Sequence, residues 1–211
     1  MSLEMSKKNM SNKVPTGNQS RQWAEVISLI KSLAIFFGIA FMLRASVVEA
    51  FKIPSSSMEP TLEIGDHILV NKLSYGIRLP LKVETLFDFR KPKRGDVVVF
   101  TLPEDSSINI IKRVIGLPND VVEVRGTRVY INGKLLDDDE GHAKWIKGGI
   151  HDFGPERVPT GHVLLLGDNR DQSRDSRLWD EAFLDVSRIK GRAFLIYWNL
   201  ASLRRMFNLI D

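Results

Sequence analysis

Three consecutive serines are the residues of this sequence best suited to act as a nucleophile. Ser55, Ser56 and Ser57 lie in the segment FKIPSSSMEPTL, residues 51–62, directly after a proline. A turn of this composition can aim a hydroxyl and a backbone N–H at one point, as attack on a carbonyl group requires. Serine-rich turns are also common in linkers, so this segment alone does not decide between a linker and a reactive site.

Lys112 is the residue most suited to act as a base. The segment INIIKRVIGLPND, residues 108–120, places it inside an apolar strand pattern with Ile110 and Val114 as same-face neighbours. Burial among apolar side chains disfavours an ammonium group and lowers the pKa of a lysine from about 10.4. A neutral amine can then take a proton from a serine hydroxyl. Spacing alone nevertheless favours the simpler interpretation that the lysine tip lies in water beside a strand.

A third polar segment, GDNRDQSRDSR at residues 167–177, follows the apolar run HVLLL. So many polar side chains directly after a core strand form either an ordinary solvated loop or the hydrogen-bonding surroundings of a site. Composition does not choose between these two interpretations.

The remaining candidates favour no metal site and no cofactor. The chain has no cysteine, which excludes disulfides and a thiol nucleophile. The acidic run 137–140 lacks the ligand spacing of a calcium loop, so we expect it to be solvated. His142 and His151 share a glycine-bearing region and are expected to be exposed loop histidines rather than a metal pair. His67 is expected to be a strand residue rather than the base of a Ser-His pair.

Taken in chain order, these motifs resemble the type I signal peptidases, which are bacterial membrane-anchored serine proteases with a Ser-Lys dyad. The resemblance runs from about residue 26 to 198 and includes an apolar helix, PSSSMEPTL, RGDVVVF at 94–100, IKRVIGLPND and GDNRDQSRDSR. It implies that Ser57 is the nucleophile and Lys112 the general base. It also implies an oxyanion hole formed by the Ser55 hydroxyl and the Ser57 N–H.

The same resemblance assigns supporting roles to further residues. Ser173 matches a serine that hydrogen-bonds the lysine, and Asp175 and Arg177 match an ion pair. The positions that match the substrate-binding pockets for small side chains are Phe51, Ile53, Pro54, Met58 and Ile111. Three residues depart from the family pattern: Ser56 and Asn119 each replace a glycine that many members have, and Gln172 replaces an asparagine.

The function implied is removal of signal peptides from secreted preproteins at the outer face of the cytoplasmic membrane, with preproteins and the lipid bilayer as partners. One apolar span and a short 121–166 segment indicate a compact member without the inserted domain of larger ones. Two alternatives stay open from the residues themselves. One is a membrane-tethered β module that binds peptides without cutting them, and the other is a self-cleaving protease related to the LexA-type repressors.

The elements that position these residues are predicted to be mainly strands. The Asn132-Gly133 pair between VYI and KLL is typical of a two-residue hairpin turn. After residue 50, only Trp179–Leu184 looks like a helical turn or two. Many strands with no βαβ rhythm favour an antiparallel sheet or open barrel. The predicted strands are His67–Asn71, Asp96–Leu102, Asn109–Ile115, Val121–Val124, Thr127–Ile131, Lys134–Leu136, His162–Leu166 and Arg192–Trp198.

The N-terminal part is predicted to be a membrane anchor. Residues 1–22 are polar and read as a disordered cytoplasmic tail, 23–45 as a transmembrane helix, and 46–211 as an extracytoplasmic peptidase domain. The apolar run 26–43 would span about 27 Å as a helix, close to a hydrocarbon core of about 30 Å. The alternatives are a signal peptide cleaved after Val48-Glu49-Ala50 and an amphipathic core helix.

The charge distribution agrees with that anchor and opposes nucleic-acid binding. The net charge is +4, and residues 1–44 carry six basic and two acidic groups, so they account for all of it. The remaining 167 residues are neutral overall and offer no surplus of cations for phosphate groups. Cations before the helix predict a cytoplasmic N-terminus. The final segment, 201–211, is expected to cap the domain rather than lie against lipid.

Overall fold

The computed structural model describes residues 17–78, 85–87, 90–102, 107–136 and 151–210, and the chain divides into two compact units, residues 1–44 and 45–211. Side chains are not described for 17–20, 39–46, 77–78 and 85–87. The predicted tail up to residue 16, the acidic run 137–140 and His142 lie outside the described residues.

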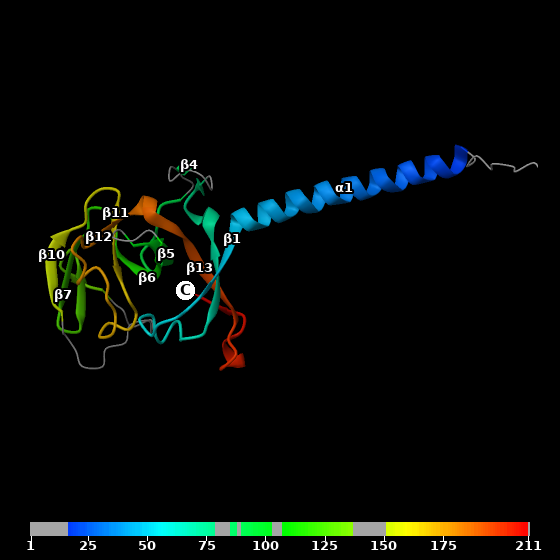
Figure 1. Ribbon diagram of the computed structural model, residues 1–211. Helices are drawn as coiled ribbons and strands as arrows, with labels where there is room; N and C mark the ends of the chain where they lie inside the picture. The colour runs from blue at the N-terminus through cyan, green and yellow to red at the C-terminus, as the bar shows by residue number, and fades with distance from the viewer. Residues whose placement is uncertain (1–16, 79–84, 88–89, 103–106, 137–150, 211) are drawn as a thin grey trace, which may run out of the picture. The chain divides into compact units, whose positions relative to one another are not determined.

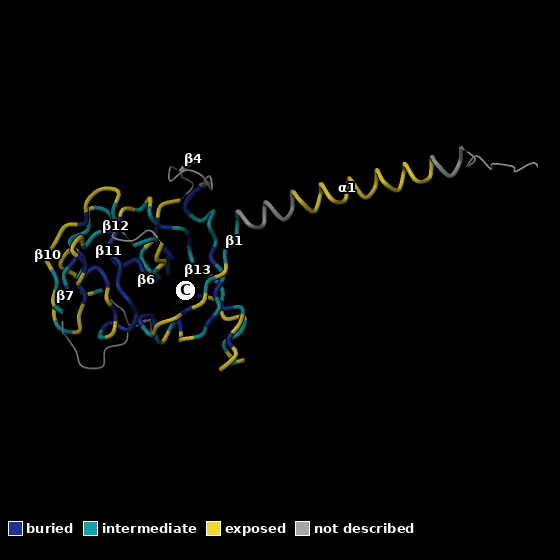
Figure 2. The backbone as a smooth tube through the Cα atoms, in the orientation of Figure 1, coloured by how far each residue is buried: buried dark blue, intermediate teal, exposed yellow. Residues whose placement is uncertain are grey.

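The N-terminal unit is helical. Helix α1 (Gly17–Val47) includes the apolar run, and its side chains at residues 21–38 are all exposed, whereas Val47 at its end is partly buried (Figure 2). Among the described residues, no helix is both long and apolar enough to cross a membrane. The predicted span over 23–45 extends to residues whose side chains lie outside the described set.

The second unit is built on an eight-stranded antiparallel sheet that forms a half-barrel (Figure 1). Its hydrogen-bonded order is β1-β2-β13-β5-β6-β11-β12, with β14 added to β13. Every pairing in it is antiparallel, which agrees with the predicted fold class. Its strands are β1 (Val48–Lys52), β2 (His67–Asn71), β5 (Val97–Thr101), β6 (Asn109–Gly116), β11 (His162–Leu166), β12 (Phe183–Asp185), β13 (Ile189–Trp198) and β14 (Asn208–Leu209).

In the described part of this unit there are also two smaller sheets and three short 3-10 helices. The four-stranded sheet has the order β10-β7-β8-β9, and its β8–β9 hairpin turns at Asn132 and Gly133, which both have positive φ. The predicted two-residue hairpin is therefore confirmed. The remaining elements are β3 (Ile77–Arg78), β4 (Thr85–Phe87), β7 (Val121–Arg125), β8 (Arg128–Ile131), β9 (Lys134–Leu135), β10 (Phe153–Arg157), and the 3-10 helices Lys72–Ser74, Val186–Arg188 and Leu203–Arg205.

Burial explains why the central strands form. The burial pattern of β2 alternates along the strand, as expected when one face lies on a core, whereas β5, β6 and β11 are buried almost continuously (Figure 2). Strand β6, which carries Lys112, is therefore covered by core side chains on both faces of the sheet. One core cluster consists of Ile53, Met58, Leu62, Ile68, Val70, Val97, Val99, Ile111, Ala193, Ile196 and Ile210.

All eight predicted strands are present, with small differences at their ends. The last one begins three residues earlier than predicted, at Ile189. The predicted helical turn at Trp179–Leu184 is wrong, because this segment passes from a turn into β12. Two of the strands that were not predicted lack an apolar period: β12 has only three residues, and β10 is exposed from Gly154 to Arg157 and contains a glycine and a proline.

The C-terminal segment caps the β unit, as expected. Strand β14 pairs with β13, and Ile210 is buried in the core. Arg205 forms ion pairs with Asp66 and Glu63 and donates to the carbonyl of Thr61. The end of the chain therefore supports the loop between β1 and β2.

Candidate active site

The loop between β1 and β2, residues 53–66, holds the three serines. Its ends are joined by two backbone hydrogen bonds, from Ile53 N to Asp66 O and from Gly65 N to Ile53 O. Met58, immediately after the third serine, is fully buried in the core. Ser57 is therefore held between two buried anchors, Ile53 and Met58, and its own side chain is largely buried.

Lys112 reaches this loop from the middle of β6. Its Nζ lies 2.8 Å from Ser57 Oγ and also donates to the carbonyl of Ile111 at 2.9 Å. Only 3% of Lys112 is exposed. In the part of the chain that the structure describes, Lys112 forms no ion pair with a carboxylate. The structure thus brings together the two residues predicted as nucleophile and base, which are 55 positions apart in the sequence.

This environment makes Lys112 a weaker base than an ordinary lysine, so a neutral amine that can accept a proton is present at lower pH. Burial lowers the pKa of Lys112 from its ordinary 10.5 to about 8, against a weaker opposing effect from the negative charges of Asp175 and Asp168. At mildly alkaline pH a large share of the molecules would carry a neutral amine. Its lone pair can accept the Ser57 hydroxyl proton across the same 2.8 Å contact.

Ser55 lies on the solvent side of the nucleophile. Its Oγ is 3.4 Å from Ser57 Oγ, and the residue is exposed. A hydroxyl in this place can donate to an oxygen that develops negative charge beside Ser57. The predicted second donor, the Ser57 N–H, belongs to the same loop.

The segment after β11 packs directly against the serine loop. Asn169 N donates to the carbonyl of Ser57 at 3.1 Å, and Asn169 Nδ2 donates to the carbonyl of Ser56 at 3.1 Å. At Gly167, a Cβ atom would overlap both the Ser57 carbonyl and the side chain of Ser173. The close approach of the two segments therefore requires glycine at position 167.

Asp175 and Arg177 form a buried ion pair at 2.8 Å. Asp175 also accepts from Gly167 N, and Arg177 donates to the carbonyl of Arg170, so the pair braces the turn of this segment. Ser173 differs from the expectation. Its Oγ is buried without a hydrogen-bond partner in the part of the chain that the structure describes, because it lies against Gly167 while the Lys112 amine is bound to Ser57 and Ile111.

The sequence interpretation missed an ion pair beside the predicted base. Arg113 binds Asp168 through two contacts, Nε to Oδ1 at 2.9 Å and Nη2 to Oδ2 at 2.8 Å. Thr61 donates to the same carboxylate at 2.6 Å. These three residues join β6, the segment after β11 and the serine loop. The position of Asp168 directly after a core strand indicated that its carboxylate could be buried, but no sequence pattern identified Arg113 as its partner.

The five positions matched to substrate-binding pockets are not equally accessible. Phe51 is half-buried and Pro54 is exposed. Ile53 and Ile111 are buried in the same core cluster as Met58, with Phe51 packed against it. Met58 has no exposed surface and so cannot line a pocket in this structure; it anchors the loop instead. His67 lies in β2, as predicted, with its ring nitrogen 3.1 Å from the carbonyl of Gly65.

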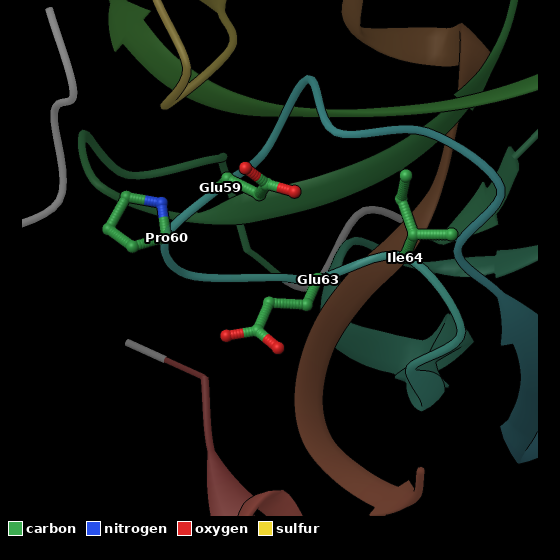
Figure 3. A pocket seen from close by; sticks show the side chains of 4 residues that line it. All are labelled: Glu59, Pro60, Glu63 and Ile64. Carbon is green, nitrogen blue, oxygen red and sulfur yellow. The ribbon is translucent and has the colours of Figure 1, made fainter. Parts of the chain in front are cut away.

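A shallow hollow of about 350 Å³ lies further along the serine loop, lined by Glu59, Pro60, Glu63 and Ile64 (Figure 3). None of these residues was predicted to take part in catalysis. Among the described residues there is no group of three or more His, Cys, Asp or Glu side chains that could hold a metal ion.

Comparison with known proteins decides the family. The family model described as "Signal peptidase, peptidase S26" matches residues 26–198, which includes the serine loop, β6 and the 167–177 segment. The chain belongs to the peptidase S26 family of signal peptidases. It is therefore a serine endopeptidase of the signal peptidase I type, and this confirms the family predicted from the motifs.

Individual signal peptidases show the same relationship. Signal peptidase I of Pseudomonas fluorescens is 41% identical over 198 residues, covering 77% of this chain and 70% of that protein. Signal peptidase I of Pseudomonas aeruginosa is 38% identical with the same coverage. The crystal structure of a signal peptidase I from Enterococcus faecalis V583 has 31% sequence identity and a TM-score of 0.42, and the match covers 50% of this chain and 98% of that chain.

Proposed function

We propose that this serine protease removes signal peptides from secreted preproteins with Ser57 as nucleophile and Lys112 as general base, through an acyl-enzyme. The observation that carries this proposal is the 2.8 Å contact between Lys112 Nζ and Ser57 Oγ, made by a lysine that is buried without an ion-pair partner among the described residues. A lysine kept only for structure would normally be paired or exposed.

In the acylation step, neutral Lys112 takes the proton of the Ser57 hydroxyl as Oγ bonds to the carbonyl carbon of the scissile peptide. The Ser57 N–H and the Ser55 hydroxyl stabilise the resulting oxyanion. Collapse of the tetrahedral intermediate breaks the C–N bond, and the Lys112 ammonium returns the proton to the leaving amine. The signal peptide remains as an ester on Ser57.

In the deacylation step, the lysine acts as the base a second time. A water molecule gives a proton to neutral Lys112 and attacks the ester carbonyl carbon. The intermediate breaks the bond to Ser57 Oγ, which regains its proton from Lys112. The products are a signal peptide with a free carboxylate and a mature protein with a free amine.

The strand pairing of β6 supports binding of the precursor in an extended form. Strand β5 pairs with β6 from Asn109 to Arg113, but β11 pairs only with the part from Arg113 to Gly116. Within the described residues no strand occupies the second edge of Asn109–Lys112. A precursor segment added at this edge would pass the scissile bond beside Lys112 and Ser57. We expect small residues one and three positions before the cleaved bond.

We also propose that α1 anchors the enzyme in the bacterial cytoplasmic membrane, with the N-terminus inside and the β unit outside. Support comes from the cation excess of residues 1–44 and from nine large apolar side chains that are exposed in the described part of α1. The topology is tested by adding protease to cells whose outer membrane has been permeabilised. A β unit that stays protected while the cytoplasmic membrane is intact would contradict it. The exposed apolar residues are Trp23, Val26, Ile27, Leu29, Ile30, Leu33, Ile35, Phe36 and Phe37.

The dyad is tested with detergent-solubilised full-length protein on a precursor with an Ala-x-Ala site. Ser57→Ala and Lys112→Ala should each abolish cleavage, whereas the exposed controls Ser187→Ala and Lys134→Ala should cleave like the unaltered protein. The profile of kcat/KM against pH should rise with a midpoint near pH 8, because the pKa of Lys112 is lowered to about 8. Full cleavage by Ser57→Ala protein, or a rate that stays flat down to pH 5, would contradict the mechanism.

A further inference from the structure

Asn169 holds the serine loop in a way that the proposed chemistry does not yet use. The residue is 1% exposed, and its carboxamide nitrogen donates to the carbonyl of Ser56. Its backbone N–H donates to the next carbonyl along, that of Ser57. Its own side-chain oxygen, Oδ1, is buried and has no hydrogen-bond partner among the described residues. Only the donor side of this carboxamide is therefore used.

The Ser56 carbonyl belongs to the same peptide unit as the Ser57 N–H. A peptide unit is planar, and its C=O and N–H point in opposite directions when the bond is trans. A hydrogen bond that fixes the direction of the Ser56 carbonyl therefore also fixes the direction of the Ser57 N–H. That N–H is the backbone donor that the proposed mechanism aims at the oxyanion.

We infer that Asn169 is a positioning residue that sets the orientation of the oxyanion-hole N–H of Ser57 through its side-chain bond to the Ser56 carbonyl. This inference rests on the proposed role of Ser57 and adds a residue to it. Without the bond, the Ser56 carbonyl keeps the backbone hydrogen bond from Glu59 N, at 3.1 Å, but loses the one that comes from the facing segment. The peptide unit is then held less firmly against rotation away from the oxyanion. The second bond to the loop, from Asn169 N to Ser57 O, uses only backbone atoms and persists whatever side chain occupies position 169.

A neighbouring contact provides a matched control. Ser56 Oγ donates to Gln172 Oε1 at 3.3 Å, so Gln172 also joins the 167–177 segment to the serine loop. This contact uses the side chain of Ser56 and does not involve its carbonyl, which accepts from Asn169 and from Glu59 N. Gln172 is exposed, whereas Asn169 is buried. Loss of Gln172 therefore weakens the contact between the segments without releasing the peptide unit.

The test compares two ligands of the full-length protein in detergent. A peptide ending in Ala-x-Ala-boronic acid accepts an electron pair from Ser57 Oγ, whose proton passes to Lys112, and so forms a tetrahedral adduct with an oxygen in the oxyanion hole. A peptide in which the scissile C=O is replaced by CH₂ binds the same surface but has no such oxygen. In Asn169→Ala protein the boronate should bind on the order of 10-fold more weakly, a part of the 10²–10³-fold effect of losing an oxyanion donor.

The reduced peptide should bind Asn169→Ala protein as it binds the unaltered protein, kcat should fall with KM unchanged, and the pH midpoint should stay in place. Gln172→Ala should leave both affinities unchanged. Equal weakening of both ligands by Asn169→Ala, or no change in either, would overturn the inference and show a merely structural or dispensable side chain. Ser57→Ala distinguishes a failure of the proposed dyad from a failure of the inference about Asn169. If Ser57→Ala protein still cleaves, the dyad is wrong. If it is inactive, the dyad stands and the Asn169→Ala results test the role of Asn169 alone.

Discussion

Two neighbouring cations in the middle of β6, Lys112 and Arg113, lie in opposite electrostatic environments. Both are about 3% exposed. Arg113 faces the carboxylate of Asp168 in a two-contact ion pair. Lys112 binds a hydroxyl and a backbone carbonyl. The carboxylates of Asp175 and Asp168 raise its pKa by their charge, but neither forms an ion pair with it in the described structure.

The difference shows how one strand can carry a charged side chain that stabilises the fold, Arg113, next to a side chain that is proposed to act as a base, Lys112. A guanidinium group stays charged and matches a carboxylate with two parallel N–H donors, so pairing is the stable way to bury it. An amine can instead lose its proton when it is buried. Adjacent residues of a strand project to opposite sides, so Arg113 binds the Asp168 carboxylate while the Lys112 amine binds Ser57.

The largest expected effect comes from exchanging the two cation types. Lys112→Arg keeps a positive charge but cannot supply a neutral base, so cleavage should fall roughly 10²–10⁴-fold. Arg113→Lys keeps the charge facing Asp168 and loses one of the two contacts, so most of the activity should remain. The measurement is kcat/KM on the Ala-x-Ala precursor for both proteins at pH 8.

Thermal unfolding of the same two proteins shows whether each is folded. Comparable losses of activity in two folded proteins would mean that Lys112 and Arg113 contribute in the same way, and the distinction between a chemical and a structural cation would be wrong.

The second effect concerns the free energy of unfolding. In Arg113→Met protein, Asp168 stays buried. Among the described side chains, only the Thr61 hydroxyl would still bind its carboxylate. Removing one partner of a buried ion pair typically costs about 3–5 kcal/mol, whereas replacing both partners by apolar residues is often close to neutral. Arg113→Met should therefore be much less stable than the double variant Arg113→Met with Asp168→Leu.

Denaturant unfolding of the two single variants and the double variant measures this coupling. A double variant as unstable as the sum of the two single ones would show that Arg113 and Asp168 act independently, despite their geometry.

The sequence predicted the central strands of the main sheet and the pairing of Ser57 with Lys112 better than it predicted the support around them, and it missed β1, β12 and β14. Apolar periods of four or more residues identify buried strands such as β5, and the family motifs align Ser57 and Lys112 by residue type. The bond from Asn169 depends on the direction of one peptide plane, which no residue pattern encodes. The burial of Met58 likewise follows from how the loop folds back on the core, and the missing Ser173 bond follows from where Gly167 lets that side chain lie.

The smallest expected effect has the opposite sign to that of Arg113→Met. Lys112→Met removes a buried group whose pKa is lowered by burial, so the folded state binds fewer protons than the unfolded state between pH 8 and 10.5. The stability of the unaltered protein should therefore rise with pH through this window relative to the Met variant. Below pH 8 the variant should be the more stable by about 3 kcal/mol, from a shift of 10.5 to about 8 at 1.36 kcal/mol per unit.

Unfolding midpoints of both proteins at pH 7 and at pH 11 test this sign directly. The two proteins should differ at pH 7 and converge at pH 11, because Lys112 is then neutral in both the folded and the unfolded chain. Lys134→Met, which removes an exposed lysine from β9, should show no such pH dependence. If Lys112→Met instead destabilised the protein at pH 7 as Arg113→Met does, Lys112 would have to be stabilised as an ammonium group, and it could not be the base of the proposed mechanism near neutral pH.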